Sequence, residues 1–514
     1  MSTAFPEKFV RKSAYGFHKL TSLLGSVTPG FILGTAGSVQ LILLVVRMFS
    51  APPYGDSDIF QYIGWYMGHG GTLYESCWDN KGPLVFVFNA TGMLFGETGF
   101  KIYCFLVALA ILGLMYKAFA FKFSRTVAAW GAFAVSLSVS FIDGGSVGNR
   151  AEVTAAVLLS LGLTLFFART GKGEHKTVDF LQGLLVVCLF MAKATYVGYG
   201  LFLLTYWFLE YRNGKNMGLL RQRVLWSSTG FFTGLTVSLT PFILQGTVAA
   251  LFDGSIYYNA FEYNKEGGFI NNFATNMYRT WPEISLSGIM LLVLLIVFHR
   301  KWNILSQFHL AVSAGVWLMG ELLLTSTVNT FFPWYLLPAS FAVLLLGLCL
   351  WEWGTPRRLC RSVTALLLGV FLLLSGLFIA RVSCHNLLRS NAAGNASPVV
   401  EELGWQGRPA VLFGGAAICR EARLARIPAR NKYVVGILHY EQTQSASRRK
   451  SIVDDAVHAM NAPETCRLLS EYRLEQLPWY RKEASFRRAA RHWTLVSVHK
   501  GIHCYAKSEL SSRQ

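Results

Sequence analysis

The run FILGTAGSVQLILLVVRMF, residues 31–49, decides the class of this protein because it is apolar almost throughout and long enough to cross a bilayer. A hydrocarbon core of about 30 Å needs about 20 apolar residues in a helix. Similar runs recur along the first three quarters of the 514-residue chain, which is 53% hydrophobic and 15% charged, with a mean hydropathy of +0.39. One soluble core does not explain so many runs. The sequence therefore predicts a polytopic α-helical membrane protein.

About eleven transmembrane helices are predicted, and charged loops separate them. The predicted spans are 31–49, 100–116, 126–142, 153–168, 180–192, 196–209, 229–246, 284–298, 308–325, 335–353 and 363–380. The fifth and sixth are short, so the segment 180–209 is open to two interpretations, a tight hairpin or one long kinked helix. The second interpretation would reverse the orientation of everything that follows.

Lysine and arginine alternate between the two sets of loops, and basic residues are retained on the cytoplasmic side during insertion. The N-terminal tail carries Lys8, Arg11, Lys12 and Lys19, and every second loop after it is also basic. The other loops hold few bases and many acids. This pattern predicts a multi-pass membrane protein with a cytoplasmic N-terminus. It also accounts for much of the net charge of +19 without a nucleic-acid partner.

Residues 381–514 are predicted to form a separate, small α/β domain on the extracytoplasmic side, while residues 1–380 form the transmembrane domain. Within 381–514, a strand at 409–415, a helix at 416–426, a second strand at 433–438 and a hairpin of 493–498 with 503–506 are expected. The pair Gly414-Gly415 after the first strand is typical of a plain turn, and less often of a phosphate-binding loop.

The first outer loop, 51–99, is far longer than a helix connection needs, and long loops of this kind usually serve function. In it, Asp56 follows the first span, Phe60 comes four residues later, and Gly70-Gly71 begins fourteen residues later. Tyr74 and then the run Lys81-Gly-Pro-Leu84 close the loop. This order resembles the GT-C glycosyltransferases, and within them family 39, which contains protein O-mannosyltransferases and the lipid A aminoarabinose transferase.

The resemblance is strongest over residues 30–210, and three further details bear on it. Ala192-Lys193-Ala194, at the outer tip between two short spans, resembles the family's Lys-Gly-Pro turn, although both small residues differ. Pro333-Trp334-Tyr335 resembles the aromatic start of a late span. Ser57 stands where the best-known members have Glu after the Asp, which leaves the role of a paired acid and the identity of the acceptor unassigned.

The resemblance implies a protein of the bacterial inner membrane that transfers a sugar from a polyprenyl-phosphate donor at the outer face of the membrane, with inversion at the anomeric carbon. The acceptor hydroxyl needs a base to take its proton, and Asp56 at the exit of the first span is the expected base. Asp58 and Asp79 are open to another interpretation, as solvated loop acids or turn caps. The departing phosphate needs positive charge, and bases are scarce on the outer face. The candidates are Lys81, Lys193, Arg150 and Arg279.

Each candidate base also has a structural interpretation. Lys81 and Lys193 could extend their charged ends to the interface, and Arg150 could pair with Glu152 or Asp143. The residues expected to contact the sugar or the acceptor are Asp58, Tyr74, Trp78, Asp79, Glu152, Trp334 and Tyr335. The acceptor class stays open among glycan, lipid and protein. No cofactor is implied with certainty, and the acids give no ligand spacing that decides whether a divalent cation takes part.

A membrane transporter of a lipid-linked or small anionic substrate is the alternative function, since it too would have many spans. No inverted or parallel repeat is visible, and the only acid that stands out inside a span is Glu321. The chemically suggestive residues gather instead in one outer loop. The sequence therefore favours the glycosyltransferase.

Overall fold

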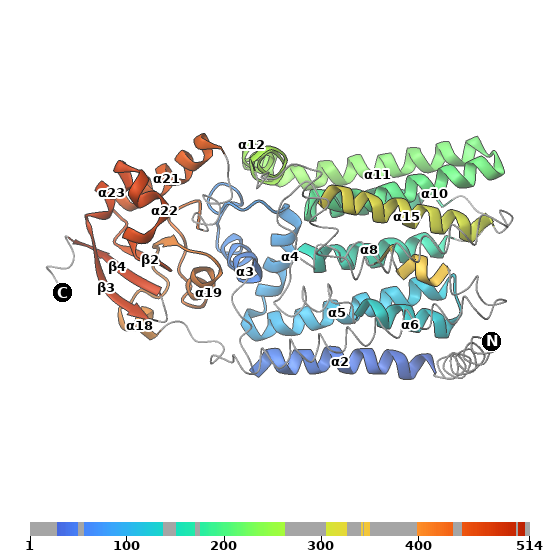
Figure 1. Cartoon of the computed structure of the whole chain (residues 1–514), viewed down its shortest axis with the longest axis horizontal. Helices are drawn as coiled ribbons and strands as arrows, with labels where there is room; N and C mark the ends of the chain where they lie inside the picture. The colour runs from blue at the N-terminus through green and yellow to red at the C-terminus, as the bar shows by residue number, and fades with distance from the viewer. Residues whose placement is uncertain are drawn as a thin grey trace, which may run out of the picture.

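The computed structural model describes residues 28–49, 56–136, 151–169, 175–262, 305–325, 341–342, 344–349, 398–434, 445–499 and 502–508. Long helices dominate the first part of the chain and lie alongside one another as a bundle (Figure 1). They are α2 (Pro29–Phe49), α5 (Gly96–Ala120), α6 (Arg125–Ser136), α8 (Ala151–Ala168), α9 (Lys176–Ala192), α10 (Gly198–Gly214), α11 (Met217–Leu244) and α15 (Leu305–Thr325). Each of them overlaps a predicted span, although α11 begins 12 residues before the predicted span 229–246.

Two helices of the described residues, α5 and α8, are long and apolar enough by length and composition to cross a membrane. Large apolar side chains on the outside of the bundle are exposed, among them Leu106 of α5 and Phe232 and Val237 of α11. Exposed apolar surface of this kind fits a lipid solvent. The predicted spans 284–298 and 363–380 lie outside the described residues, as does most of 335–353, so the number eleven stays a prediction.

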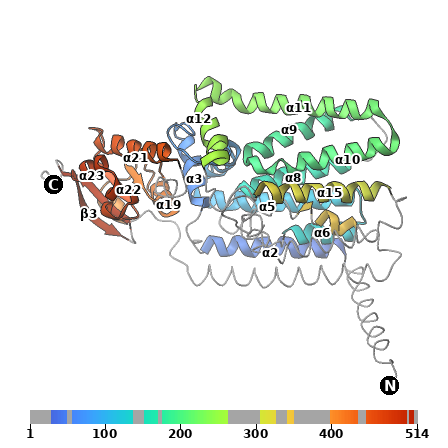
Figure 2. The ribbon, with the colours of Figure 1, turned by 45° about the horizontal axis from the view of Figure 1, so that its top comes forward.

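The segment 180–209 is a hairpin and not one kinked helix. The start of α9 and the end of α10 lie at the same end of the bundle, since Asp179 pairs with Arg169, and Glu210 pairs with Arg223 beside them. Lys193 has an extended backbone between α9 and the short helix η1 (Ala194–Val197), which leads into α10. Both helices run separately along the bundle (Figure 2).

Glycines let α9 and α11 pack with their backbones almost in contact. A Cβ atom on Gly183 would lie 1.8 Å from the carbonyl oxygen of Ser227, and one on Gly230 would lie 1.9 Å from that of Phe180. Small residues are the usual means of close packing between membrane helices, where no hydrophobic effect drives association. This close pair forms one side of the bundle.

The long first loop contains two helices, α3 (Asp56–Met67) and α4 (Pro83–Met93), which lie at one end of the bundle (Figure 1). At the same end, α11 continues into α12 (Val248–Phe252) and then into η2 (Asp253–Glu262), a π-helix. Gly64 lets α3 approach α4, because a Cβ atom there would be 2.6 Å from the backbone nitrogen of Ala90. These elements face the C-terminal part of the chain.

The C-terminal part holds a four-stranded mixed sheet with the order β1-β2-β4-β3. β1 is parallel to β2, and the other pairs are antiparallel. The strands are β1 (Val411–Phe413), β2 (Arg467–Ser470), β3 (Trp493–His499) and β4 (Ile502–Lys507). The helices are α18 (Pro398–Glu402), α19 (Ala416–Leu424), α21 (Ala446–Asn461), η4 (Leu474–Gln476), α22 (Pro478–Lys482) and α23 (Ala484–Ala490).

Three of the expected elements in this part are present: the strand β1, the helix α19, and the β3–β4 hairpin. The expected strand at 433–438 lies mostly outside the described residues, and its first two residues are irregular. β2 was not predicted from the sequence. The sheet packs around buried aromatic rings of Phe413, Trp479 and Phe486, whose centroids lie 5.7–6.0 Å apart.

Candidate active site

A cavity of about 240 Å³ lies where the first loop, the α9–η1 turn and the α11–η2 segment meet. Its polar lining includes Lys81 and Lys193, two of the four bases that the sequence singled out. Most of the wall is apolar, contributed by side chains including Phe190, Met191, Leu235, Leu239, Leu251 and Ile256. Two cations in a largely apolar pocket form a site suited to an anion with an apolar body.

Lys81 is held from several sides. Its Nζ donates to Oδ1 of Asn80 at 2.6 Å, and its backbone N donates to Oδ1 of Asp79 at 2.9 Å. The hydroxyl of Tyr74 donates to the Lys81 carbonyl at 2.5 Å. Tyr74 is fully buried against Phe86 and Phe242. The backbone that carries the ammonium group is therefore fixed before any ligand arrives.

Lys193 lies 3.3 Å from Oε1 of Glu152, which also accepts a hydrogen bond of 2.8 Å from the Tyr196 hydroxyl. Burial lowers the pKa of Lys193 to about 8, although Glu152 opposes that shift. The charge of Lys81 lowers this pKa further. The two ammonium groups therefore repel each other, and an anion placed between them would remove the repulsion.

Gly82 explains how two lysines that are so far apart in sequence come to share the cavity. A Cβ atom on Gly82 would lie 2.0 Å from the carbonyl oxygen of Met191 and 3.0 Å from that of Ala192. Only glycine allows the first loop to press against the end of α9 at this point. The Lys-Gly-Pro run thus brings Lys81 to the turn that carries Lys193.

Asp56 is the first residue of α3 and is half-buried, and it is not among the residues that line the cavity. Its charge acts on Asp79, which lies beside the cavity residues Asn80 and Lys81. Burial raises the pKa of Asp79, Lys81 opposes that shift, and Asp56 adds to it. Asp56 therefore lies close enough to the 79–81 loop for the two carboxylates to interact.

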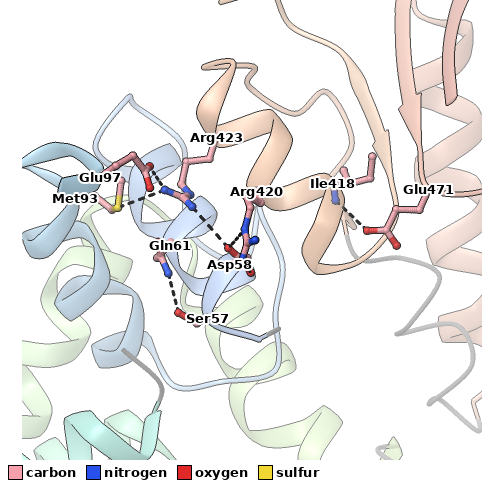
Figure 3. A network of polar contacts seen from close by, with 9 residues as sticks. All are labelled: Ser57, Asp58, Gln61, Met93, Glu97, Ile418, Arg420, Arg423 and Glu471. Carbon is pink, nitrogen blue, oxygen red and sulfur yellow. Dashed lines mark hydrogen bonds and ion pairs between the residues drawn. The ribbon is translucent and has the colours of Figure 1, made fainter. Parts of the chain in front are cut away.

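Asp58 lies in a different place from the lysines. It is buried, and Arg420 of α19 donates to both of its oxygens, from Nε to Oδ1 at 2.7 Å and from Nη2 to Oδ2 at 2.8 Å (Figure 3). Arg423 lies 3.7 Å from the same carboxylate and also pairs with Glu97. Asp58 therefore joins the first loop to the C-terminal part of the chain.

Trp78 is also buried, with an exposed fraction of 1%. Its ring lies edge-on to Tyr258 of η2 at 4.9 Å, beside Tyr433 at 5.3 Å, and under the guanidinium of Arg448 at 5.6 Å. Its backbone N donates to the Lys432 carbonyl at 3.0 Å. Trp78 and Tyr74 thus support the loop on which Lys81 sits.

The turn at Gly414-Gly415 binds one of the protein's own carboxylates. Oε1 of Glu471 accepts the backbone N–H of Ile418 at the start of α19 at 2.9 Å (Figure 3). A Cβ atom on Gly414 would lie 2.4 Å from the Ile418 side chain and 2.9 Å from that of Glu471. The space a phosphate would take is filled, which agrees with the interpretation of a plain turn.

Four residues singled out from the sequence, Arg150, Arg279, Trp334 and Tyr335, lie outside the described residues. Within the described residues, no group of three metal-ligating side chains is present. The sequence reasoning missed Asn80 and Asn259, which line the cavity, and Arg448, which lies behind it. Asn80 stands next to Lys81 and could have been included with it, whereas the other two carry no local signal.

The bundle and the C-terminal sheet together have the fold of the GT-C glycosyltransferases, as the sequence resemblance implied. The structure of ArnT from Cupriavidus metallidurans bound to undecaprenyl phosphate is similar, with a TM-score of 0.60 and 13% identity over 93% of this chain and 98% of that chain. ArnT from the same organism in the apo state has a TM-score of 0.58 and 12% identity over the same shares of the chains.

The apo form of the Archaeoglobus fulgidus oligosaccharyltransferase is similar at a TM-score of 0.50 and 10% identity, over 91% of this chain and 73% of that chain. No protein-family model and no curated protein matches the sequence. The similarity is therefore one of fold, and the chemistry has to be argued from the site.

Proposed function

We propose that this protein is a membrane glycosyltransferase that moves a sugar from a polyprenyl-phosphate donor to an acceptor at the outer face of the membrane. The observation that carries the proposal is the pairing of Lys81 and Lys193 in one largely apolar cavity. A fold shared with a structure that contains undecaprenyl phosphate supports it. The lysines would hold the phosphate of the donor and stabilise the charge that develops on it as the sugar departs.

Asp56 is the proposed general base. It would take the proton of the acceptor hydroxyl as the oxygen attacks the anomeric carbon, so that the sugar is transferred in one displacement with inversion. Its place at the start of α3, in electrostatic contact with the 79–81 loop, supports this role. Asp79 is buried and its Oδ1 already accepts the backbone N–H of Lys81, so it is less available to an acceptor hydroxyl than Asp56.

The experiment that tests the donor uses purified protein in detergent, with a polyprenyl-phosphate sugar and a nucleotide sugar offered in parallel. We expect turnover of the lipid-linked sugar alone. Lipid extracts from a deletion strain would identify the donor sugar, because the unused lipid-linked sugar should accumulate. Turnover of a nucleotide sugar without any polyprenyl phosphate would overturn the proposal.

The orientation follows from the same proposal. The C-terminal sheet lies at the same end of the bundle as α4 and α12 (Figure 1), and both of these helices contribute residues to the cavity lining. We place this end on the extracytoplasmic side of a bacterial inner membrane because its loops are poor in bases. A reporter fused after Gln514 should be active only as an extracytoplasmic reporter. Activity as a cytoplasmic reporter would mean that the predicted number of spans is wrong.

A further inference from the structure

The π-helix η2 (Asp253–Glu262) forms one wall of the cavity, through Ser255, Ile256 and Asn259. π-Helical geometry is rare and is found mostly as single turns at functional sites, so a ten-residue stretch needs support from outside. Support from the first loop is visible at Gly254, where a Cβ atom would lie 2.8 Å from the Tyr74 ring. Further support comes from the C-terminal part of the chain.

One side chain, Arg448 in the first turn of α21, contacts both ends of η2. Its Nη1 donates to Oδ2 of Asp253 at 2.7 Å, its Nη2 donates to the other oxygen of that carboxylate, and its Nε donates to Oε2 of Glu262 at 2.9 Å. Asp253 and Glu262 are the first and last residues of the π-helix. The Arg448 and Glu262 side chains are 11% and 10% exposed, so solvent weakens their contact little, whereas the Asp253 side chain is 32% exposed and its contact is screened more.

The same guanidinium also touches the loop that carries Lys81. It lies 5.6 Å from the ring centroid of Trp78, and Nη1 donates to the Tyr433 hydroxyl at 3.3 Å. A cation over an indole face is attracted by the ring, more strongly where water is excluded. Arg448 is thus in contact with two of the segments that build the cavity.

Hydrogen bonds connect η2 to the ammonium group of Lys81. Asn259 donates from Nδ2 to the Asn80 carbonyl at 2.5 Å and accepts from Nδ2 of Asn80 at 3.2 Å. Oδ1 of Asn80 accepts from Nζ of Lys81 at 2.6 Å. A displacement of η2 would therefore move Asn259, then Asn80, and finally the charge that faces the cavity.

We propose that Arg448 is a positioning residue of the donor site, which holds η2 in place so that Lys81 faces the donor phosphate. The inference rests on the proposed function. It gives the C-terminal part of the chain a definite task, because donor affinity then depends on a residue that does not line the cavity. Arg448 acts through η2 and need not touch the donor.

The test compares the full-length wild type with Arg448→Met, which keeps the aliphatic stem and removes the guanidinium. Lys450→Met is the matched control, since it removes a positive charge from an exposed position on the same helix. Two quantities are measured: hydrogen exchange of peptides covering 253–262, and equilibrium binding of undecaprenyl phosphate. Glu262→Gln is a second variant that frees only one end of η2, and it serves if Arg448→Met does not fold.

We expect faster exchange in 253–262 and a dissociation constant at least about tenfold higher for Arg448→Met, with Lys450→Met like the wild type. Glu262→Gln should change both in the same direction, and combining it with Arg448→Met should add little. Unchanged exchange in Arg448→Met, or faster exchange with unchanged binding, would overturn the inference. A wild type that binds no undecaprenyl phosphate would instead overturn the proposed function, and the inference with it.

Discussion

Asp56 and Asp58 stand two residues apart, but replacing each by Asn should change different properties. Asp58→Asn should lower stability and leave turnover nearly unchanged, whereas Asp56→Asn should lower turnover and leave stability unchanged. Asp58 accepts two hydrogen bonds from Arg420, and the two side chains are 6% and 14% exposed. Asn keeps one acceptor oxygen, but its amide group turns a donor toward an N–H of Arg420 and removes the charge that balances a buried guanidinium. Breaking a buried pair on one side costs about 3–5 kcal/mol. Because Asn retains one acceptor, we expect about 3 kcal/mol.

This loss should appear where α19 contacts α3. Local opening free energies are measured by native-state hydrogen exchange, so the protection of α19 amides should fall about 10²-fold in Asp58→Asn. Arg420→Gln should have a similar effect, and the double variant should be much less destabilised than the sum of the two. The turnover of molecules that remain folded should change little.

Asp56→Asn should leave the protection of α19 unchanged, because the carboxylate that joins α3 to α19 through Arg420 is that of Asp58. It keeps the shape of the side chain but cannot accept a proton, so turnover should fall about 10²-fold or more while donor binding persists. Sugar transfer by purified, folded protein is the measurement. Full activity in Asp56→Asn with a folded but inactive Asp58→Asn would exchange the two roles, and full activity in both would refute the mechanism.

Three further predictions concern the lysine cavity. Lys193 loses its proton as the pH rises through about 8, so kcat/KM for the donor should fall above that pH, and Lys193→Arg should move the fall to higher pH. Lys81→Ala should weaken donor binding by about 1.5–3 kcal/mol, measured as the dissociation constant of undecaprenyl phosphate. Gly82→Ala should weaken it too, because the new Cβ would lie 2.0 Å from the Met191 oxygen, whereas Gly113→Ala meets nothing within 4 Å and should be neutral.

The helices of the bundle were predictable because the length of an apolar run is a local property of the chain. The same holds for the β3–β4 hairpin, which the sequence predicts from two apolar segments on either side of Lys500-Gly501. Lys81 and Lys193 were singled out because bases are scarce in the outer loops, and the structure places both in one cavity. The physical link between them, Gly82 against Met191, becomes visible only in three dimensions.

Contacts between distant segments could not be predicted. Asp58 was considered as a contact for sugar or acceptor, yet its partner Arg420 stands 362 residues away and nothing near either residue indicates the pair. The π-helix η2 has no sequence signature that separates it from an irregular loop. Its support by Arg448 depends on a residue 195 positions beyond Asp253. The partners in such pairs meet only in the folded protein, and no local sequence pattern marks them.

The shape of the cavity indicates how a lipid-linked donor would lie in it. Lys81 and Lys193 belong to the segments at the end of the bundle, while Leu235 and Leu239 of the wall belong to α11, four residues apart and so on one face of that helix. A cavity of about 240 Å³ can enclose a headgroup but not a long polyprenyl chain. The chain would therefore leave along α11, toward its exposed apolar side chains, while the phosphate stays between the two lysines. An anion with a long apolar tail would place its charge beside the two lysines and its tail against the apolar wall along α11. A nucleotide sugar is polar throughout, so it could pair with the lysines but would leave the apolar wall without an apolar partner.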